Sequence, residues 1–162
     1  MEFFFRELTK ADLPFQEEML YQSIYVPEDK DVYPKDIIYN PLIFKYLKNW
    51  GREGDFGLIA ESTENHELLG AAWYRFFSEN DKAFGYVDSS TPELSIAVLY
   101  EHRNKGIGTK LMINLINHAK NVGIKQLSLS VIPENTAVNL YKRLGFETVN
   151  SALPHLVMKL DL

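Results

Sequence analysis

This chain contains no cysteine among its 162 residues. Disulfide bonds, thiolate metal ligands and a thiolate nucleophile are therefore all excluded. It also has no run of eighteen apolar residues, which excludes a membrane-spanning helix of ordinary length. The first residues, 1–6, carry no basic leader, so we expect no secretory signal and a cytoplasmic location.

An excess of positive charge is lacking as well. The net charge is −5, whereas binding to a phosphate backbone needs clustered lysine and arginine, so we expect no nucleic acid partner. Apolar residues make up 46% and charged residues 24%, which is ordinary for a globular chain and gives no sign of a membrane partner. We see no linker or repeat and predict a single domain over residues 1–162.

Spacings typical of metal ligands are also missing. Four histidines are present, but none forms an H-E-x-x-H motif or pairs with a carboxylate in a recognisable pattern, so we expect no metal site. His102 is interpreted as a surface loop residue, and His155 is not assigned a role. No G-x-S-x-G nucleophile elbow occurs either.

The most informative segment that is present covers residues 103–109 and holds two glycines, Gly106 and Gly108. It follows a strand-like run at 93–98 and leads into a helical pattern at 109–122. The first N–H groups of a helix lack intrahelical partners and attract anions, and glycine lets a phosphate approach the backbone. The segment therefore predicts a phosphate- or pyrophosphate-binding loop.

Other nucleotide-binding patterns do not fit this loop. No G-x-x-x-x-G-K-[ST] Walker loop occurs, and a G-x-G-x-x-G dinucleotide fingerprint would need a third glycine. The remaining non-functional interpretation is an ordinary surface loop with two glycines after a strand.

The loop resembles the acyl-CoA loop of the GCN5-related N-acetyltransferases, whose pattern Q/R-x-x-G-x-G/A fits residues 103–108 at every fixed position. The strand at 93–98 is similar to that family's E-L-x-I-A-V strand. Downstream, Asn135 follows a second strand, and residues 140–146 match the family's L-Y-x-x-x-G-F segment. These motifs cover residues 93–147, and the order of elements extends the resemblance loosely to the whole chain.

The resemblance implies the acyl-CoA N-acyltransferase fold, an α+β fold with a mixed, mostly antiparallel sheet flanked by helices. Hydrophobic patterns and turn residues predict the order β-α-α-β-β-β-α-β-α-β-β. The predicted strands cover 2–8, 55–61, 67–77, 93–98, 125–132, 146–149 and 156–160. The predicted helices cover 10–25, 35–49 with a break at the Asn-Pro pair, 109–122 and 136–144.

The same resemblance implies acetyl-CoA as co-substrate and assigns residues to it. The backbone at Ala97 and Val98 would pair with the pantetheine arm, and the Val98 N–H would polarise the thioester carbonyl. Asn135, and Asn139 one turn later, would bond the pantetheine chain, although Asn135 is equally well interpreted as a helix N-cap. The pyrophosphate cradle would consist of Arg103, Asn104, Lys105, Gly106, Ile107, Gly108 and Thr109.

Two residues match catalytic positions of the family. Tyr141 corresponds to the tyrosine that protonates the departing thiolate, and Glu93 to a strand glutamate that acts as general base, directly or through waters. Each has a plainer interpretation. Tyr141 would be a half-buried packing aromatic, and Glu93 a strand-end carboxylate in solvent.

The resemblance therefore predicts an N-acetyltransferase that moves an acetyl group directly from CoA to a primary amine of a small molecule or a protein. The alternative is a non-catalytic acyl-CoA-binding sensor or interaction module on the same fold. Homodimers are frequent in the family, so a dimer stays open. Aromatic candidates for the acceptor wall, most of them expected in the core, are Tyr21, Tyr25, Phe44, Trp50, Trp73 and Tyr74.

Overall fold

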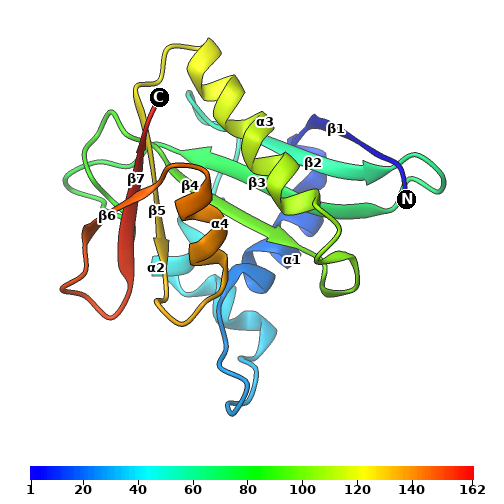
Figure 1. Cartoon of the computed structure of the whole chain (residues 1–162), viewed down its shortest axis with the longest axis horizontal. Helices are drawn as coiled ribbons and strands as arrows, with labels where there is room; N and C mark the ends of the chain where they lie inside the picture. The colour runs from blue at the N-terminus through cyan, green and yellow to red at the C-terminus, as the bar shows by residue number, and fades with distance from the viewer. The chain divides into compact units, whose positions relative to one another are not determined.

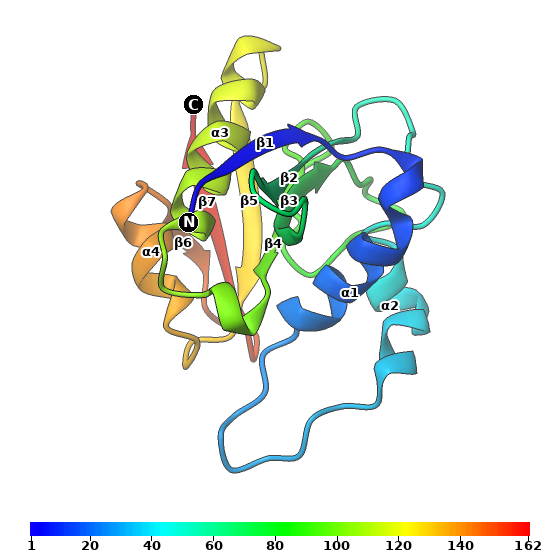
Figure 2. The same ribbon diagram turned by 90° about the vertical axis from the view of Figure 1, so that its right-hand side faces the viewer.

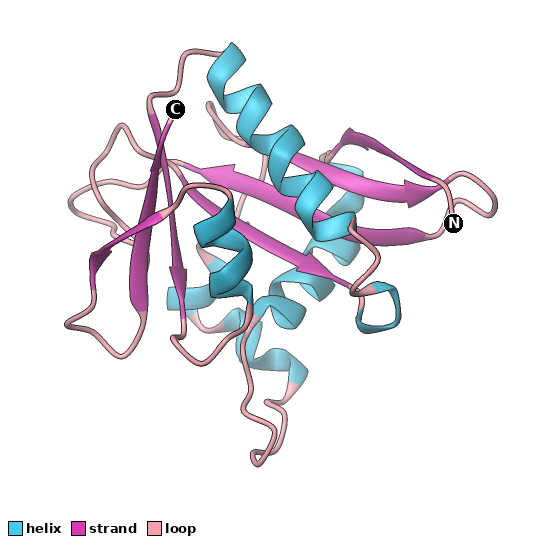
Figure 3. Ribbon diagram, viewed as in Figure 1, coloured by secondary structure: helices cyan, strands magenta, loops and turns pink.

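The computed structural model describes residues 1–162 and contains seven strands in one sheet, in the order β1-β2-β3-β4-β5-β7-β6 (Figure 3). The strands are β1 (Phe3–Glu7), β2 (Phe56–Ser62), β3 (Leu68–Arg75), β4 (Glu93–Val98), β5 (Gln126–Val131), β6 (Glu147–Asn150) and β7 (Leu156–Asp161). The α-helices are α1 (Leu13–Ser23), α2 (Pro41–Phe44), α3 (Ile107–Asn121) and α4 (Ala137–Arg143). Short 3₁₀ turns are η1 (Lys10–Asp12), η2 (Lys35–Tyr39) and η3 (Tyr100–His102).

The sheet mixes antiparallel and parallel pairing. β1 pairs antiparallel with β2, and β7 pairs antiparallel with both β5 and β6. β4 pairs parallel with β5, where Glu93 lies opposite Ser128. These pairings confirm the predicted α+β fold with a mixed, mostly antiparallel sheet.

The chain divides into two compact units, which are described separately. The first unit comprises Met1–Trp73 and Ser95–Leu115. The indole N–H of Trp73 donates to the carbonyl of Tyr46 at 3.0 Å inside this unit. The long connection from α1 to η2 contains no strand or helix (Figure 2). The fully buried apolar side chains of the unit include Met19, Leu47, Ile59, Leu69, Ile107 and Leu111.

The second unit comprises Tyr74–Leu94 and Ile116–Leu162. It contains β5, β6, β7 and α4, together with the long connection that leads from β3 to β4. Its core is built by inward-facing residues of β5 and β7, among them Leu127, Leu129 and Met158. The expectation of one domain over residues 1–162 stays a prediction.

The first predicted helix, 10–25, begins as the 3₁₀ turn η1 and continues as α1 to Ser23. Asp12 accepts a hydrogen bond from the Thr9 backbone N–H at 2.8 Å, an arrangement typical of a capping box. The helix therefore starts where the sequence indicates, with a tighter first turn.

The second predicted helical range, 35–49, breaks at the Asn-Pro pair as predicted, but it is less regular and shorter than predicted. The structure has only η2 and the four-residue α2 in this range. Asn40 caps α2 by accepting from the Leu42 N–H at 3.0 Å, so the Asn-Pro pair starts a new element as expected. Regular structure then stops, and Asn49 adopts a left-handed φ of 56°.

Helix α3 begins directly after the glycine-bearing loop (Figure 1). Its buried stripe of Leu111, Leu115 and Ala119 has the spacing of one helical face. Neither α3 nor any other helix combines the length and hydropathy that crossing a bilayer requires.

Candidate functional site

The glycine loop lies in the first unit, between η3 and α3. Asn104 and Gly106 have φ angles of 62° and 82°, in the left-handed region that glycine enters without strain. A Cβ added to Gly106 would meet no heavy atom within 4 Å, so the backbone is open at this point. Two left-handed residues so close together turn the chain sharply into the helix.

The start of α3 presents backbone donors. The Lys110 N–H donates to the Gly106 carbonyl at 3.1 Å, which is the first hydrogen bond that closes a full turn here. The N–H groups from Gly106 to Thr109 therefore precede the helical ladder and have no acceptor within the helix. The helix dipole adds positive potential at the same place, so this segment can bind an anion.

Gly108 is not required by packing within the chain. A Cβ there would lie 3.7 Å from Cγ2 of Val98, an ordinary van der Waals distance. A glycine that the fold does not need leaves room for a ligand to approach the first turn of α3. Because α3 begins at Ile107, two residues earlier than predicted, both Ile107 and Gly108 belong to the helix.

Arg103 is exposed and folds back on the end of β4. Its Nε donates to the Val98 carbonyl at 3.0 Å, and Nη2 lies 3.4 Å from Oε1 of Gln22. Its guanidinium carbon lies 5.6 Å from the centre of the Tyr100 ring. A guanidinium carries five N–H donors, so others remain for an anion beside the loop.

The end of β4 is held against β3 by a glycine that the sequence analysis missed. A Cβ on Gly70 would lie 2.9 Å from the Ala97 carbonyl oxygen and 3.2 Å from Cα of Val98. The Leu99 N–H continues this pairing by donating to the Leu69 carbonyl at 2.9 Å. A glycine inside a strand is the signal that could have indicated such a close approach.

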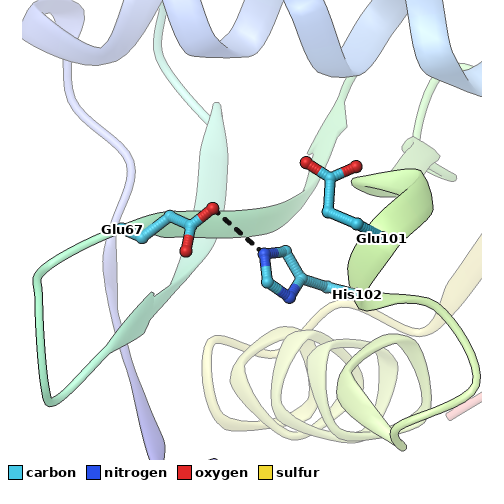
Figure 4. Close-up of side chains that lie close together, drawn as sticks. All are labelled: Glu67, Glu101 and His102. Atoms are coloured by element: carbon cyan, nitrogen blue, oxygen red, sulfur yellow. Dashed lines mark hydrogen bonds and ion pairs between the residues drawn. The ribbon is translucent and has the colours of Figure 1, made fainter.

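A second set of polar side chains is formed by two residues of η3, just before the loop, and one residue next to β3. Glu67, Glu101 and His102 each offer one ligand atom within 4.8 Å of the others (Figure 4). His102 Nε2 lies 3.1 Å from Oε1 of Glu67, and this hydrogen bond lowers the pKa of Glu67. His102 is only 7% exposed, so its interpretation as a surface loop residue is wrong.

The surroundings of His102 favour a hydrogen bond from its neutral ring to Glu67 over a metal centre. Its Nδ1 is buried and has no hydrogen-bond partner. A metal on Nε2 would require Nδ1 to carry the proton, which would leave a buried donor without an acceptor. The pair instead fastens η3 to the start of β3. Sequence spacing could not reveal it, because Glu67 and His102 are 35 positions apart.

Glu93 lies in the second unit at the start of β4. Only 2% of the residue is exposed, and its Oε1 accepts the Gly85 backbone N–H at 2.5 Å. The interpretation as a strand-end carboxylate in solvent is therefore wrong. A buried carboxylate needs such partners, because burying an unpaired charge is costly.

Tyr141 lies on α4 in the same unit. Its residue is 8% exposed, and its ring meets Phe146 edge-on, with centroids 6.1 Å apart. Burial raises the pKa of Tyr141 to about 12. A phenol with this pKa keeps its proton at neutral pH and can only donate it there, and burial makes it a weaker acid than a free phenol.

Asn135 and Asn139 belong to the start and middle of the α4 segment. Oδ1 of Asn135 accepts from the Ala137 N–H at 2.9 Å, one residue before the N-cap position, Thr136, so Asn135 supports the start of α4 without being its N-cap. Asn139 is exposed on α4. Neither observation decides whether these side chains also bind a ligand, and that role stays a prediction.

The aromatic candidates divide by burial. Trp50, Trp73 and Tyr74 are buried, which confirms that they are core residues. Tyr21 and Tyr25 are half-buried, as is Phe44, and the Tyr21 hydroxyl donates to the carbonyl of Tyr33. Candidates for an acceptor wall are therefore the half-buried three.

The structure distributes the predicted residues over both units. Ala97, Val98 and the segment 103–109 belong to the first unit. Glu93, Asn135, Asn139 and Tyr141 belong to the second.

The comparisons with known proteins all point to one family. The model of the acetyltransferase (GNAT) family matches residues 18–146. The uncharacterized N-acetyltransferase YobR of Bacillus subtilis (strain 168) is 42% identical over 57 residues, which are 35% of this chain and 23% of that protein. That match thus spans less than a quarter of the relative's length.

Solved structures share the fold over nearly all of the chain. A ribosomal-protein-alanine N-acetyltransferase from Brucella melitensis has 23% identity and a TM-score of 0.67, covering 98% of this chain and 99% of that one. An N-acetyltransferase from Staphylococcus aureus Mu50 has 21% identity and a TM-score of 0.70, covering 99% of each. A phosphinothricin acetyltransferase from Sinorhizobium meliloti, solved with AcCoA, has 20% identity and a TM-score of 0.69, covering 100% and 89%.

Proposed function

This chain belongs to the acetyltransferase (GNAT) family, and we therefore propose that it moves an acetyl group directly from the thioester of acetyl-CoA to a primary amine. The observation that carries the proposal is the run of backbone N–H groups from Gly106 to Thr109 at the start of α3, within the matched range. The complex of a structural neighbour with AcCoA supports the choice of co-substrate.

In this proposal residues of both units bind the co-substrate. The segment 103–109 cradles the pyrophosphate with its backbone donors, and Arg103 adds positive charge. Ala97 and Val98 offer their backbone to the pantetheine arm, and the Val98 N–H polarises the thioester carbonyl. Asn135 and Asn139 add side-chain contacts to the pantetheine chain.

Proton transfers are assigned to two residues of the second unit. Glu93 takes the proton from the acceptor ammonium, directly or through water, so that the neutral amine can attack the thioester carbonyl. A C–N bond forms and the C–S bond breaks. Tyr141 donates its proton to the departing thiolate. The absence of cysteine supports direct transfer, since no acyl-cysteine can form.

The acceptor is an amine of a small molecule or of a protein, and fold alone does not select between them. The half-buried side chains Tyr21, Tyr25 and Phe44 are candidates for its binding wall. Aromatic faces attract cationic amines. A cytoplasmic location and a homodimer stay predictions of this account.

An amine panel tests the proposed activity. The purified protein is incubated with acetyl-CoA and either spermidine, single amino acids, an aminoglycoside or a lysine-containing peptide, and CoA thiol release is followed with a chromogenic thiol reagent. The protein contributes no thiol background, because it has no cysteine. Thiol release with at least one amine is expected. Saturable acetyl-CoA binding without turnover on any amine would favour the non-catalytic sensor instead.

A further inference from the structure

The long connection between β3 and β4 is fastened at two adjacent residues, Phe84 and Gly85. The Gly85 N–H donates to Oε1 of Glu93 at 2.5 Å. Nε2 of His155, from the connection between β6 and β7, lies 2.9 Å from the Phe84 carbonyl oxygen. The rings of Phe84 and His155 also meet edge-on, with centroids 5.6 Å apart. All these residues belong to the second unit.

Gly85 also packs directly on the backbone of β5. A Cβ at this position would lie 2.7 Å from the carbonyl carbon of Leu129 and 2.8 Å from the Ser130 nitrogen. It would also lie 2.8 Å from Oε1 of Glu93. Backbone atoms cannot move aside as the end of a flexible side chain can, so only glycine fits here. The Gly85 N–H that donates to Glu93 therefore lies directly against the backbone of β5.

His155 reaches this point from 71 positions away in the chain. A carbonyl can only accept, so the ring nitrogen facing Phe84 carries a proton. Both the neutral tautomer protonated on Nε2 and the imidazolium satisfy this requirement. The contact joins the connection between β6 and β7 to the residue next to Gly85.

We propose that His155 is a positioning residue for the transfer reaction. It holds the Phe84 carbonyl, and thereby the adjacent Gly85 N–H, so that the Glu93 carboxylate keeps one orientation for accepting the amine proton. This inference rests on the proposed function and on the proposed role of Glu93. General-base catalysis depends on hydrogen-bond geometry, so a loosened carboxylate slows the chemical step more than it weakens co-substrate binding.

Three variants test the role of His155. His155→Ala removes the donor, and His155→Gln places an amide N–H at a similar distance from the backbone. His66→Ala is the control, because it also removes a histidine hydrogen bond, here to the Glu61 carboxylate at 2.8 Å, from a side chain that is 75% exposed. The measured quantities are kcat and KM with acetyl-CoA and the fastest amine of the panel, and the hydrogen-exchange rate of the Gly85 amide.

We expect His155→Ala to lower kcat by about tenfold with KM for acetyl-CoA within twofold. Gln at position 155 should recover most of the loss, and His66→Ala should match the unchanged protein. The Gly85 amide should exchange faster in His155→Ala and also in Glu93→Gln. Faster exchange in both would show that the two contacts hold one loop.

Two results would overturn the inference. One is a His155→Ala variant with unchanged kcat beside a strongly slowed Glu93→Gln variant, which leaves the proposed function intact. The other is unchanged Gly85 exchange in His155→Ala, which needs no turnover to be measured. Failure of the proposed function itself would appear separately, as absent acetyl-CoA binding by the unchanged protein.

Discussion

Gly106 and Gly123 form a matched pair of residues for testing the anion-binding loop. Their φ angles are 82° and 85°, and a Cβ on either would meet nothing within 4 Å. Alanine should therefore cost about 1 kcal/mol of folding free energy at each position, through backbone strain alone. Only Gly106→Ala should weaken acetyl-CoA binding, because only Gly106 lies in the proposed cradle. Denaturant unfolding and calorimetry measure the two effects, and equal affinity losses in both variants would point to a global cause.

Tyr141→Phe separates proton donation from packing at a single residue. Phenylalanine keeps the edge-on contact with Phe146 and removes the hydroxyl. General acids contribute about 10²- to 10⁴-fold to rates, so we expect kcat to fall by a factor in that range while acetyl-CoA affinity stays within about twofold. Steady-state kinetics with the panel's best amine, beside calorimetry, measure both. Parallel losses in rate and affinity would mean that Tyr141 only packs.

Some features of the site were predictable from short sequence patterns, and others were not. The glycine loop, the Asn135 hydrogen bond at the start of α4 and the strand ending at Val98 were predictable, because each depends on neighbours in sequence. The contact between Glu67 and His102 and that between His155 and Phe84 were not, since their partners lie 35 and 71 positions apart. The burial of Glu93 was not predictable either, because its partner Gly85 lies in a connection whose path no short pattern encodes.

Among the elements, the strands and α3 were predicted well and the second helix was not. Strand β4 spans the predicted 93–98 range, since alternating and β-branched residues between turn signals define it. Helix α3 starts two residues earlier than predicted. The prediction excluded Gly108 because glycine is a weak helix former. The range 35–49 fails as a continuous helix because Asn40, the residue before Pro41, is extended with a ψ of 126°, and Asn49 has a left-handed φ of 56°.

The close pairing of β3 with the end of β4 leads to a prediction about these elements. Gly70→Ala would place a methyl group 2.9 Å from the Ala97 carbonyl oxygen, so it should destabilise the fold by about 1–3 kcal/mol. It should also weaken acetyl-CoA binding, because the end of β4 must move. Gly57→Ala is the control, since its Cβ would lie 2.8 Å from Cβ of Trp73 and 3.2 Å from the Ala72 carbonyl oxygen.

Denaturant unfolding measures the stability of Gly70→Ala and Gly57→Ala, and calorimetry measures their affinity for acetyl-CoA. Both variants should lose stability, and Gly70→Ala alone should lose affinity at temperatures where both are folded. Similar affinities for the two would show that the position of the β4 end does not matter for binding.

For the whole molecule, buried phenols predict how stability depends on alkaline pH. Burial raises the pKa of Tyr74 and of Tyr141 to about 12, whereas a phenol in the unfolded chain ionises near 10. A raised folded-state pKa means that stability is complete below about pH 10 and falls as the pH rises towards about 12. Urea unfolding between pH 9 and pH 12 should show this loss, and Tyr141→Phe should reduce its slope. An unfolding free energy that does not change between pH 9 and pH 12 would contradict the raised pKa of these two tyrosines.

The central claim for the whole molecule is that it binds acetyl-CoA through the start of α3. The most direct measurement is a calorimetric titration of the purified protein with acetyl-CoA, with ATP and NAD as controls and Gly106→Ala beside Gly123→Ala. The account predicts saturable binding of acetyl-CoA, none of comparable strength for ATP or NAD, and weakening only in Gly106→Ala. No saturable binding of acetyl-CoA by the unchanged protein would contradict it.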